Sequence, residues 1–300
     1  MPTFLGLSAI TLWGGLALLG SLTTQVPAFQ LLFFCFSISA GLMFLNRIVQ
    51  KRPLLQRPDM TASQWFTGIM GLFGFHFCYF MALRFAPAMQ ISLIVYLWPL
   101  LLTVLVATSG QRKRAILGGI TGFIGVSLVI TQNQSGAATS VISTQYLTGY
   151  ALAICCALIW SSYSWSLAKN AGSPDDLGWL SLAVAALSLA AHLLLEKTYW
   201  PLTQTELLGS LLLGLGPVGG AFYLWDTGMK HGNRSLLAIS SFAAPLITAF
   251  SLVIAGISDW SLILLTALVL VITGGLIANP PKAKERSTNG VSSESELSQS

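Results

Sequence analysis

Ten apolar stretches, separated by short polar or Pro- and Gly-containing segments, make up most of this 300-residue chain. A helix needs about 20 mostly apolar residues to cross a hydrocarbon core of about 30 Å. Only 8% of the residues are charged, whereas soluble domains carry about 25%. The sequence therefore predicts an all-α membrane protein with ten transmembrane helices. The predicted spans are about residues 3–20, 29–46, 64–85, 89–108, 114–131, 147–168, 177–195, 206–227, 235–256 and 260–278.

Basic residues mark one side of this arrangement. Thirteen of the fifteen Lys and Arg residues follow even-numbered stretches, and only Arg84 and Lys197 follow odd-numbered ones. Because cytoplasmic loops carry an excess of Lys and Arg, both termini are predicted to be cytoplasmic. The polar composition of residues 280–300 predicts a disordered cytoplasmic tail. The basic residues form no single patch, which argues against a nucleic-acid partner.

The chain is predicted to contain an internal repeat, because residues 75–105 resemble residues 221–250. Constant shifts of 146 or 147 residues pair Tyr79 with Trp225, Tyr96 with Phe242, Pro99 with Pro245, and Trp13 with Trp160. Five spans in each half, residues 1–134 and 135–279, put the halves in opposite orientations. Such inverted repeats place a substrate site near the midplane and support alternating access. Pro99 and Pro245 are predicted hinges, because a proline kinks a membrane helix.

Aromatic residues lie at mid-depth in three spans: Tyr79, Tyr96, Trp98 and Trp160. Interfacial belts explain Trp and Tyr at the ends of spans but not at their centres. The pattern predicts a central cavity lined by rings, suited to flat and partly apolar solutes. Helix packing is the alternative interpretation of each single aromatic residue.

Few polar side chains accompany these rings. His76 can bind a carboxylate or relay a proton, or it can be a neutral packing residue. Gln90 can bond a substrate amine or carboxylate, or it can face water. Asp226, Lys230 and His231 can line an inner gate, although a solvated helix end is the simpler expectation. No Asp or Glu is predicted at the midplane.

No catalytic motif, metal-ligand spacing or disulfide framework is present in the sequence, so no enzyme, metal or cofactor is predicted. Five glycines in two spans indicate close helix contacts, which would form either a scaffold or the face of a homodimer. These glycines are Gly118, Gly122, Gly125, Gly274 and Gly275.

Three motifs strengthen the interpretation: Tyr96-Leu97-Trp98-Pro99, Ile159-Trp160-Ser161-Ser162-Tyr163, and His231-Gly232-Asn233 followed by Phe242-Ala243-Ala244-Pro245. With them the chain resembles the drug/metabolite transporter superfamily, EamA family, and its aromatic amino acid exporter (YddG-type) branch, from about residue 3 to 278. The resemblance implies an inner-membrane exporter whose cavity aromatics are Tyr79, Tyr96, Trp98 and Trp160. Some members have Asn and an acidic residue where Val95 and Gln90 stand here, which leaves substrate preference and proton coupling open.

The predicted function is that of a secondary transporter in the bacterial inner membrane. Its partners are membrane lipid and a small-molecule substrate, best an aromatic or other large neutral amino acid. The alternative is a broad drug or organic-cation exporter, because aromatic cages also suit cations. The absence of a buried acid at the midplane argues against that alternative.

The distribution of basic residues makes the topology testable. A reporter fused after residue 280 should report a cytoplasmic location, because the basic side of a membrane protein stays inside. A matched fusion in the loop after Arg84 should report the opposite side. A periplasmic signal from the first fusion would overturn both the topology and the even span count.

Overall fold

The computed structural model describes residues 1–132, 144–167, 169, 172–256 and 259–278, and all regular structure in these ranges is helical. The predicted tail, residues 280–300, lies outside the described residues. The elements are α1 (Pro2–Gly14), α2 (Leu16–Gly20), the 3₁₀ turn η1 (Ser21–Thr23), α3 (Ala28–Val49), α4 (Ala62–Ile69), the π-helical turn η2 (Met70–Gly74), α5 (Phe75–Phe85), α6 (Ala88–Val95), α7 (Trp98–Val106), α8 (Arg112–Gln132), α9 (Thr144–Leu167), α10 (Pro174–Leu195), α11 (Gln204–Leu215), α12 (Gly220–His231), α13 (Arg234–Ser240), the 3₁₀ turn η3 (Ser241–Ala243), α14 (Ala244–Ile254) and α15 (Leu262–Ala278).

Each of the ten predicted stretches is helical over most of its length. In the described residues, seven helices are long and apolar enough to cross a membrane, and eight if the pair α1 and α2, bent by 42°, counts as one span. The remaining two stretches are shorter apolar helices, Gln90–Val106 and Leu262–Ala278. The prediction of an all-α membrane protein is confirmed, whereas the count of ten spans stays a prediction.

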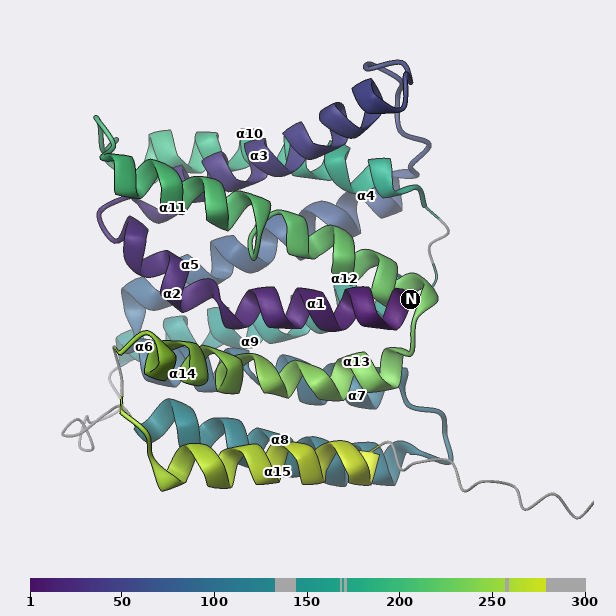
Figure 1. The fold of residues 1–300 in the computed structure, drawn as a ribbon, viewed down its shortest axis with the longest axis vertical. Helices are drawn as coiled ribbons and strands as arrows, with labels where there is room; N and C mark the ends of the chain where they lie inside the picture. Colours follow the sequence, from purple (N-terminus) through teal and green to yellow (C-terminus); the bar gives the residue numbers. More distant parts are fainter. Residues whose placement is uncertain (133–143, 168, 170–171, 257–258, 279–300) are drawn as a thin grey trace, which may run out of the picture.

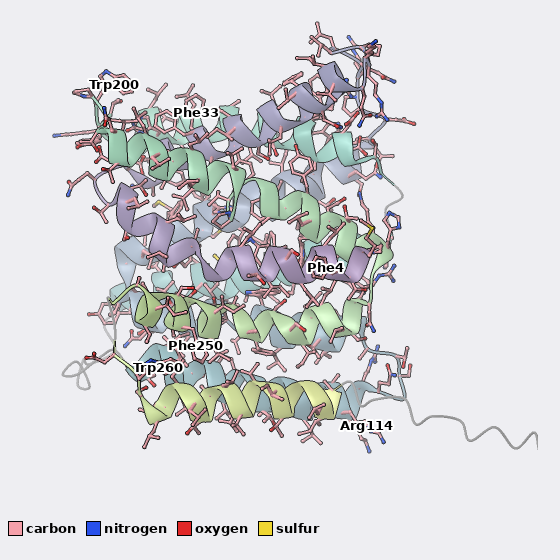
Figure 2. The ribbon with its side chains drawn as sticks, in the orientation of Figure 1. Phe4, Phe33, Arg114, Trp200, Phe250 and Trp260 are labelled. Atoms are coloured by element: carbon pink, nitrogen blue, oxygen red, sulfur yellow. The ribbon has the colours of Figure 1, made fainter. Side chains whose placement is uncertain are left out.

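The helices run back and forth between two ends of the bundle (Figure 1). At one end lie the C-termini of α3 and α12 and the N-termini of α8 and α13, which carry Arg47, Lys230, Arg112 and Arg234; we call this the basic end. Trp200 and Trp260 lie at the opposite end, away from Arg114 (Figure 2). These two tryptophans are largely exposed, as expected for an interfacial belt.

Helices from distant parts of the chain lie side by side. α3 packs along α10, α1 along α12, α5 along α9, and α8 along α15 (Figure 1). Because charged residues are rare on these helices, the contacts are mostly between apolar side chains. The pair α8 and α15 forms one edge of the bundle and the pair α3 and α10 the opposite edge, with the other two pairs between them.

Two spans are broken where a proline kink was expected. α6 ends at Val95 and α7 begins at Trp98, while η3 separates α13 from α14. Pro99 and Pro245 each lie in the first turn of the second helix, where a missing N–H leaves no bond unmade. A short irregularity thus precedes each proline inside a stretch that is otherwise helical (Gln90–Val106 and Arg234–Ile254), as expected for a kink, and the hinge role of the two prolines stays a prediction.

Glycines bring α8 and α15 into backbone contact. A Cβ atom on Gly118 would lie 2.4 Å from the carbonyl oxygen of Gly274, and one on Gly274 would lie 2.5 Å from that of Gly118. No side chain fits at either position without moving a helix. The predicted close helix packing agrees with the geometry at Gly118 and Gly274, whereas it is wrong for Gly275, where the nearest atom to an added Cβ is 4.0 Å away.

Adjacent glycines on α15 provide a matched test of this contact. Gly274→Ala should force α8 and α15 apart and destabilise the fold by about 1–3 kcal/mol, as overpacking does. Gly275→Ala should be tolerated, because the nearest atom to its Cβ, on Ile239, is 4.0 Å away. Thermal unfolding of both variants in detergent measures the difference, and equal unfolding temperatures would contradict it.

Candidate functional site

A cavity of about 340 Å³ lies inside the bundle, within the range of ligand pockets. Its lining comes from both halves of the chain, including α1, α3, α5, α9 and α12. Trp98 and Trp160 lie in the centre of the bundle, while Gly20 and Ala28 border the loop at the end opposite to the basic end. The cavity therefore extends from the centre towards that opposite end.

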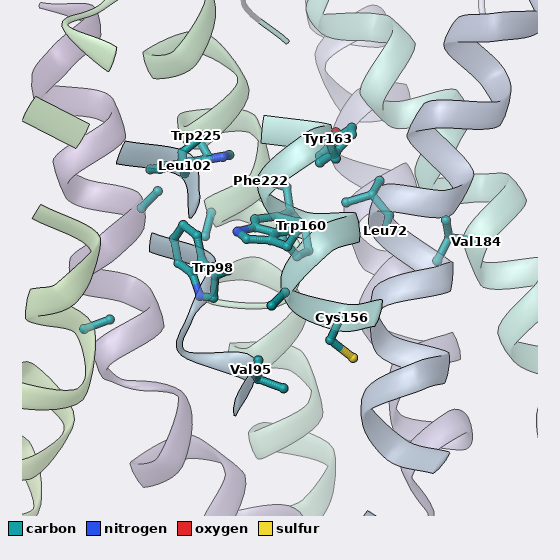
Figure 3. Close-up of a cluster of buried hydrophobic side chains, with 14 of the residues drawn as sticks. Leu72, Val95, Trp98, Leu102, Cys156, Trp160, Tyr163, Val184, Phe222 and Trp225 are labelled. Atoms are coloured by element: carbon teal, nitrogen blue, oxygen red, sulfur yellow. The ribbon is translucent and has the colours of Figure 1, made fainter. Parts of the chain in front are cut away.

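Four indole rings meet at the inner limit of the cavity. The ring centroid of Trp13 lies 5.7 Å from that of Trp160, 6.4 Å from that of Trp98 and 5.1 Å from that of Trp225. Trp98 crosses Trp160 at 88° and Trp225 at 90°, the edge-to-face geometry that aromatic pairs prefer. Figure 3 shows Trp98, Trp160 and Trp225 converging from three helices. We call these four residues the tryptophan cluster.

Hydrogen bonds fix two rings of the tryptophan cluster. The indole N–H of Trp13 donates to the carbonyl oxygen of Pro217 at 3.0 Å, in the irregular segment between α11 and α12. The indole N–H of Trp225 donates to the hydroxyl of Ser164 on α9, also at 3.0 Å. α1 and α9 are thus both bound to the span that contains α11 and α12.

Five of the six predicted substrate-binding residues line the cavity together: His76, Tyr79, Tyr96, Trp98 and Trp160. The sixth, Gln90, is not among the lining residues. Its side-chain oxygen accepts a hydrogen bond from the hydroxyl of Tyr150, so it joins α6 to α9. From sequence alone, the register between these two helices was unknown.

His76 makes its bond to its own helix. Its Nδ1 lies 2.6 Å from the carbonyl oxygen of Leu72, and a carbonyl can only accept, so Nδ1 carries the proton. In the neutral ring, Nε2 is then the acceptor. Rings of Phe36 and Phe222 cross the imidazole nearly perpendicularly, with centroids 5.8 Å and 6.1 Å away. His76 is therefore a polar group set among aromatic rings.

Sequence reasoning missed several lining residues. Trp13 was recognised only as the repeat partner of Trp160, a pairing that could have placed it at the same depth. Phe75, stacked parallel to Tyr79 at 6.3 Å, and Phe222, stacked on Phe36 at 5.7 Å, carried no signal beyond hydrophobicity. Among the described residues that line the cavity, none is Asp, Glu, Lys or Arg.

Near the basic end, the expectation of a solvated helix end proves wrong. Asp226 and Lys230 form an ion pair at 2.8 Å with side chains only 9% and 8% exposed. Four residues apart, they share one face of α12, and α12 packs against α9 and α10. Of the three residues considered there, only His231 is exposed.

A central cavity lined at the breaks of discontinuous helices is typical of membrane transporters. The sequence profile of the EamA-like transporter family matches residues 1–131. The chain is 38% identical over 282 residues to the aromatic amino acid exporter YddG of Ancylobacter novellus, covering 92% of this chain and 96% of that protein. It is 26% identical over 168 residues to YddG of Escherichia coli K12, covering 54% and 57% of the two chains.

A solved crystal structure with 36% identical residues superposes with a TM-score of 0.83, covering 93% of this chain and 96% of the other. The protein therefore belongs to the EamA-like transporter family. The relatives named here are transporters. A multi-pass position in the membrane follows from the family and from the apolar helices.

Proposed function

We propose that this protein exports aromatic and other large neutral amino acids across the bacterial inner membrane. The observation that carries the proposal is the cavity of about 340 Å³ walled by Tyr79, Trp98 and Trp160, with no charged side chain among the described lining residues. Two relatives are named as aromatic amino acid exporters, and this supports the same substrate class here.

Ring stacking and desolvation would select the substrate. An aromatic pair contributes about 0.5–1.5 kcal/mol beyond the burial of its area. A charged side chain would lose its water without gaining a partner on these walls. The charged ends of the amino acid would be met by His76, Tyr79, Tyr96 and Ser92, the polar side chains of the lining. Gln90, bonded to Tyr150, would act indirectly by holding α6 in place.

Alternating access between two inverted repeats, residues 1–134 and 135–279, is the proposed mechanism. Under the repeat, α1 corresponds to α9 and α12 to α5, so the packed pairs α1–α12 and α9–α5 are equivalent. Both halves also break their fourth span before a proline. These features support ten spans with a pseudo-twofold axis.

The two ends of the bundle are packed differently. Towards the basic end, α12 packs against both α9 and α10. The equivalent helix α5 instead faces α1 across the cavity, which Trp13, Leu16, Phe75 and Tyr79 line. With the basic end in the cytoplasm, this arrangement is an outward-facing state.

Trp98→Ala tests the substrate. Cells with this variant should become more sensitive to toxic phenylalanine analogues than cells with the wild-type protein, because a ring of the cavity is lost. Growth at increasing analogue concentration measures the effect at matched protein levels. Trp260→Ala, which removes a largely exposed ring at the far end, should protect as well as the wild type.

Two outcomes would oppose the proposal. Full protection by Trp98→Ala would exclude stacking at this position, even if the substrate class is right. A wild-type protein that protects cells against a cationic dye but not against the analogues would favour the alternative drug exporter.

Pro99→Ala tests the proposed hinge. Restoring a backbone N–H allows α6 and α7 to continue as one helix, which would resist bending at Tyr96 and Leu97. We expect transport to slow more than folded yield falls, measured as uptake by proteoliposomes per folded protein. Pro2→Ala is the control, because Pro2 also begins a helix but no break precedes it within a span. Normal transport by Pro99→Ala would remove the hinge role.

A further inference from the structure

A second, smaller pocket of about 40 Å³ lies near the basic end, between α4, α9, α10 and α12. Its chemistry is the reverse of that of the central cavity. Asp176, Asp226 and Lys230 all line it, together with the hydroxyl-bearing side chains of Thr67 and Tyr163. It is a charged pocket beside an uncharged one.

Lys230 is the centre of this group. Its ammonium nitrogen lies 2.8 Å from Oδ2 of Asp226 and donates to the carbonyl oxygen of Gly172 at 3.2 Å. Asp176, partly buried on α10, interacts electrostatically with both Lys230 and Asp226. One cation thus faces two carboxylates. Buried ion pairs contribute little to stability compared with apolar packing, whereas ionisable residues within membrane segments tend to mark substrate or ion pathways.

One pair of rings separates the two pockets. Tyr163 lines the small pocket and Trp160 lines the central cavity, and their ring centroids lie 5.6 Å apart on α9 (Figure 3). Tyr163 fits against Gly71, where a Cβ atom would lie 2.2 Å from its ring. Gly71 belongs to the π-helical turn η2, a form of backbone found mostly at functional sites. The wall between the pockets therefore rests on an irregular turn.

We infer that the small pocket is the loading site for the charged head of a zwitterionic amino acid. When the substrate binds, its carboxylate replaces Asp226 as the partner of Lys230, and its ammonium group pairs with Asp226 and Asp176. Because the zwitterion is neutral, it adds no net charge to the buried group. The inference rests on the proposed export of amino acids, and it adds a site at the basic end.

The volume of the small pocket indicates that it must widen before a substrate can bind. A pocket of about 40 Å³ has room for water but not for an amino acid. Lys230, which would receive the substrate carboxylate, also holds α12 to Gly172 beside α10. The site therefore gains room for the substrate when this bond breaks and the basic end opens. The aromatic side chain would then pass the Tyr163–Trp160 wall into the central cavity.

Lys230→Gln, assayed in proteoliposomes with two solutes, tests the site. Phenylalanine carries both charges, and phenylalaninamide lacks the carboxylate. Since a charge-assisted hydrogen bond is lost, the KM for phenylalanine should rise about tenfold or more, while that for phenylalaninamide should stay nearly unchanged. Lys169→Gln is the matched control, because this lysine near the same end lies over the Trp165 ring instead.

The partner variant gives the reverse selectivity. Asp226→Asn should weaken the transport of phenylalanine but not that of 3-phenylpropionate, which lacks the ammonium group. Because a single substitution leaves one buried charge unpaired, the double variant Asp226→Asn with Lys230→Gln is assayed as well. It should leave neither member of the ion pair without its partner and should lose the preference for phenylalanine over phenylalaninamide, whereas Asp176 would still favour solutes that carry an ammonium group.

The outcomes separate the two proposals. If the wild type transports phenylalanine and the variants change the KM values of all solutes by the same factor, the ion pair only locks the closed end. The loading site is then wrong, and the proposed function stands. The loading site is also wrong if the double variant keeps wild-type selectivity. A wild type that transports no zwitterionic amino acid overturns both.

Discussion

The constraint on which this structure depends is the absence of water in the hydrocarbon core. Backbone groups there must be paired within the protein, so helix breaks are tolerated only where other segments or a cavity can satisfy them. The breaks inside spans are the bend between α1 and α2, η2, the residues between α6 and α7, those between α11 and α12, and η3. All of them lie inside the bundle, at or next to residues that line the central cavity. The carbonyl oxygen of Pro217, for example, is satisfied by the indole of Trp13.

Much of this arrangement could be predicted because a lipid environment requires long apolar stretches that are easily recognised in the sequence. Apolar length alone located the ten stretches, and an aromatic side chain at mid-depth has few explanations other than a ring-lined interior. His76, Tyr79, Tyr96, Trp98 and Trp160 were predicted on that basis, and the structure brings them to one cavity. Depth is encoded by position along a span, which the sequence shows directly.

Orientation around a helix could not be predicted in the same way. A helix that is apolar on every side gives no periodic signal for the face that points inward, so Gln90 could not be assigned to the α9 contact rather than to the cavity. The prediction of solvent exposure for Asp226 and Lys230 was wrong for a related reason. Their place near the end of a span suggested solvent, but whether a helix end is covered depends on α9 and α10, which are distant in sequence.

The basic end also contains a second ion pair, and it limits where that end can open. Arg47 on α3 lies 3.2 Å from Asp175 on α10, and its guanidinium donates to the carbonyl oxygens of Pro53, Leu54 and Gln56. This arginine is only 3% exposed, so solvent screens the pair little. α3, α10 and the loop after α3 are therefore held as one body. Opening at this end would have to move α12 away from this body, and Lys230, which donates to the carbonyl oxygen of Gly172 just before α10, spans that gap beside the small charged pocket.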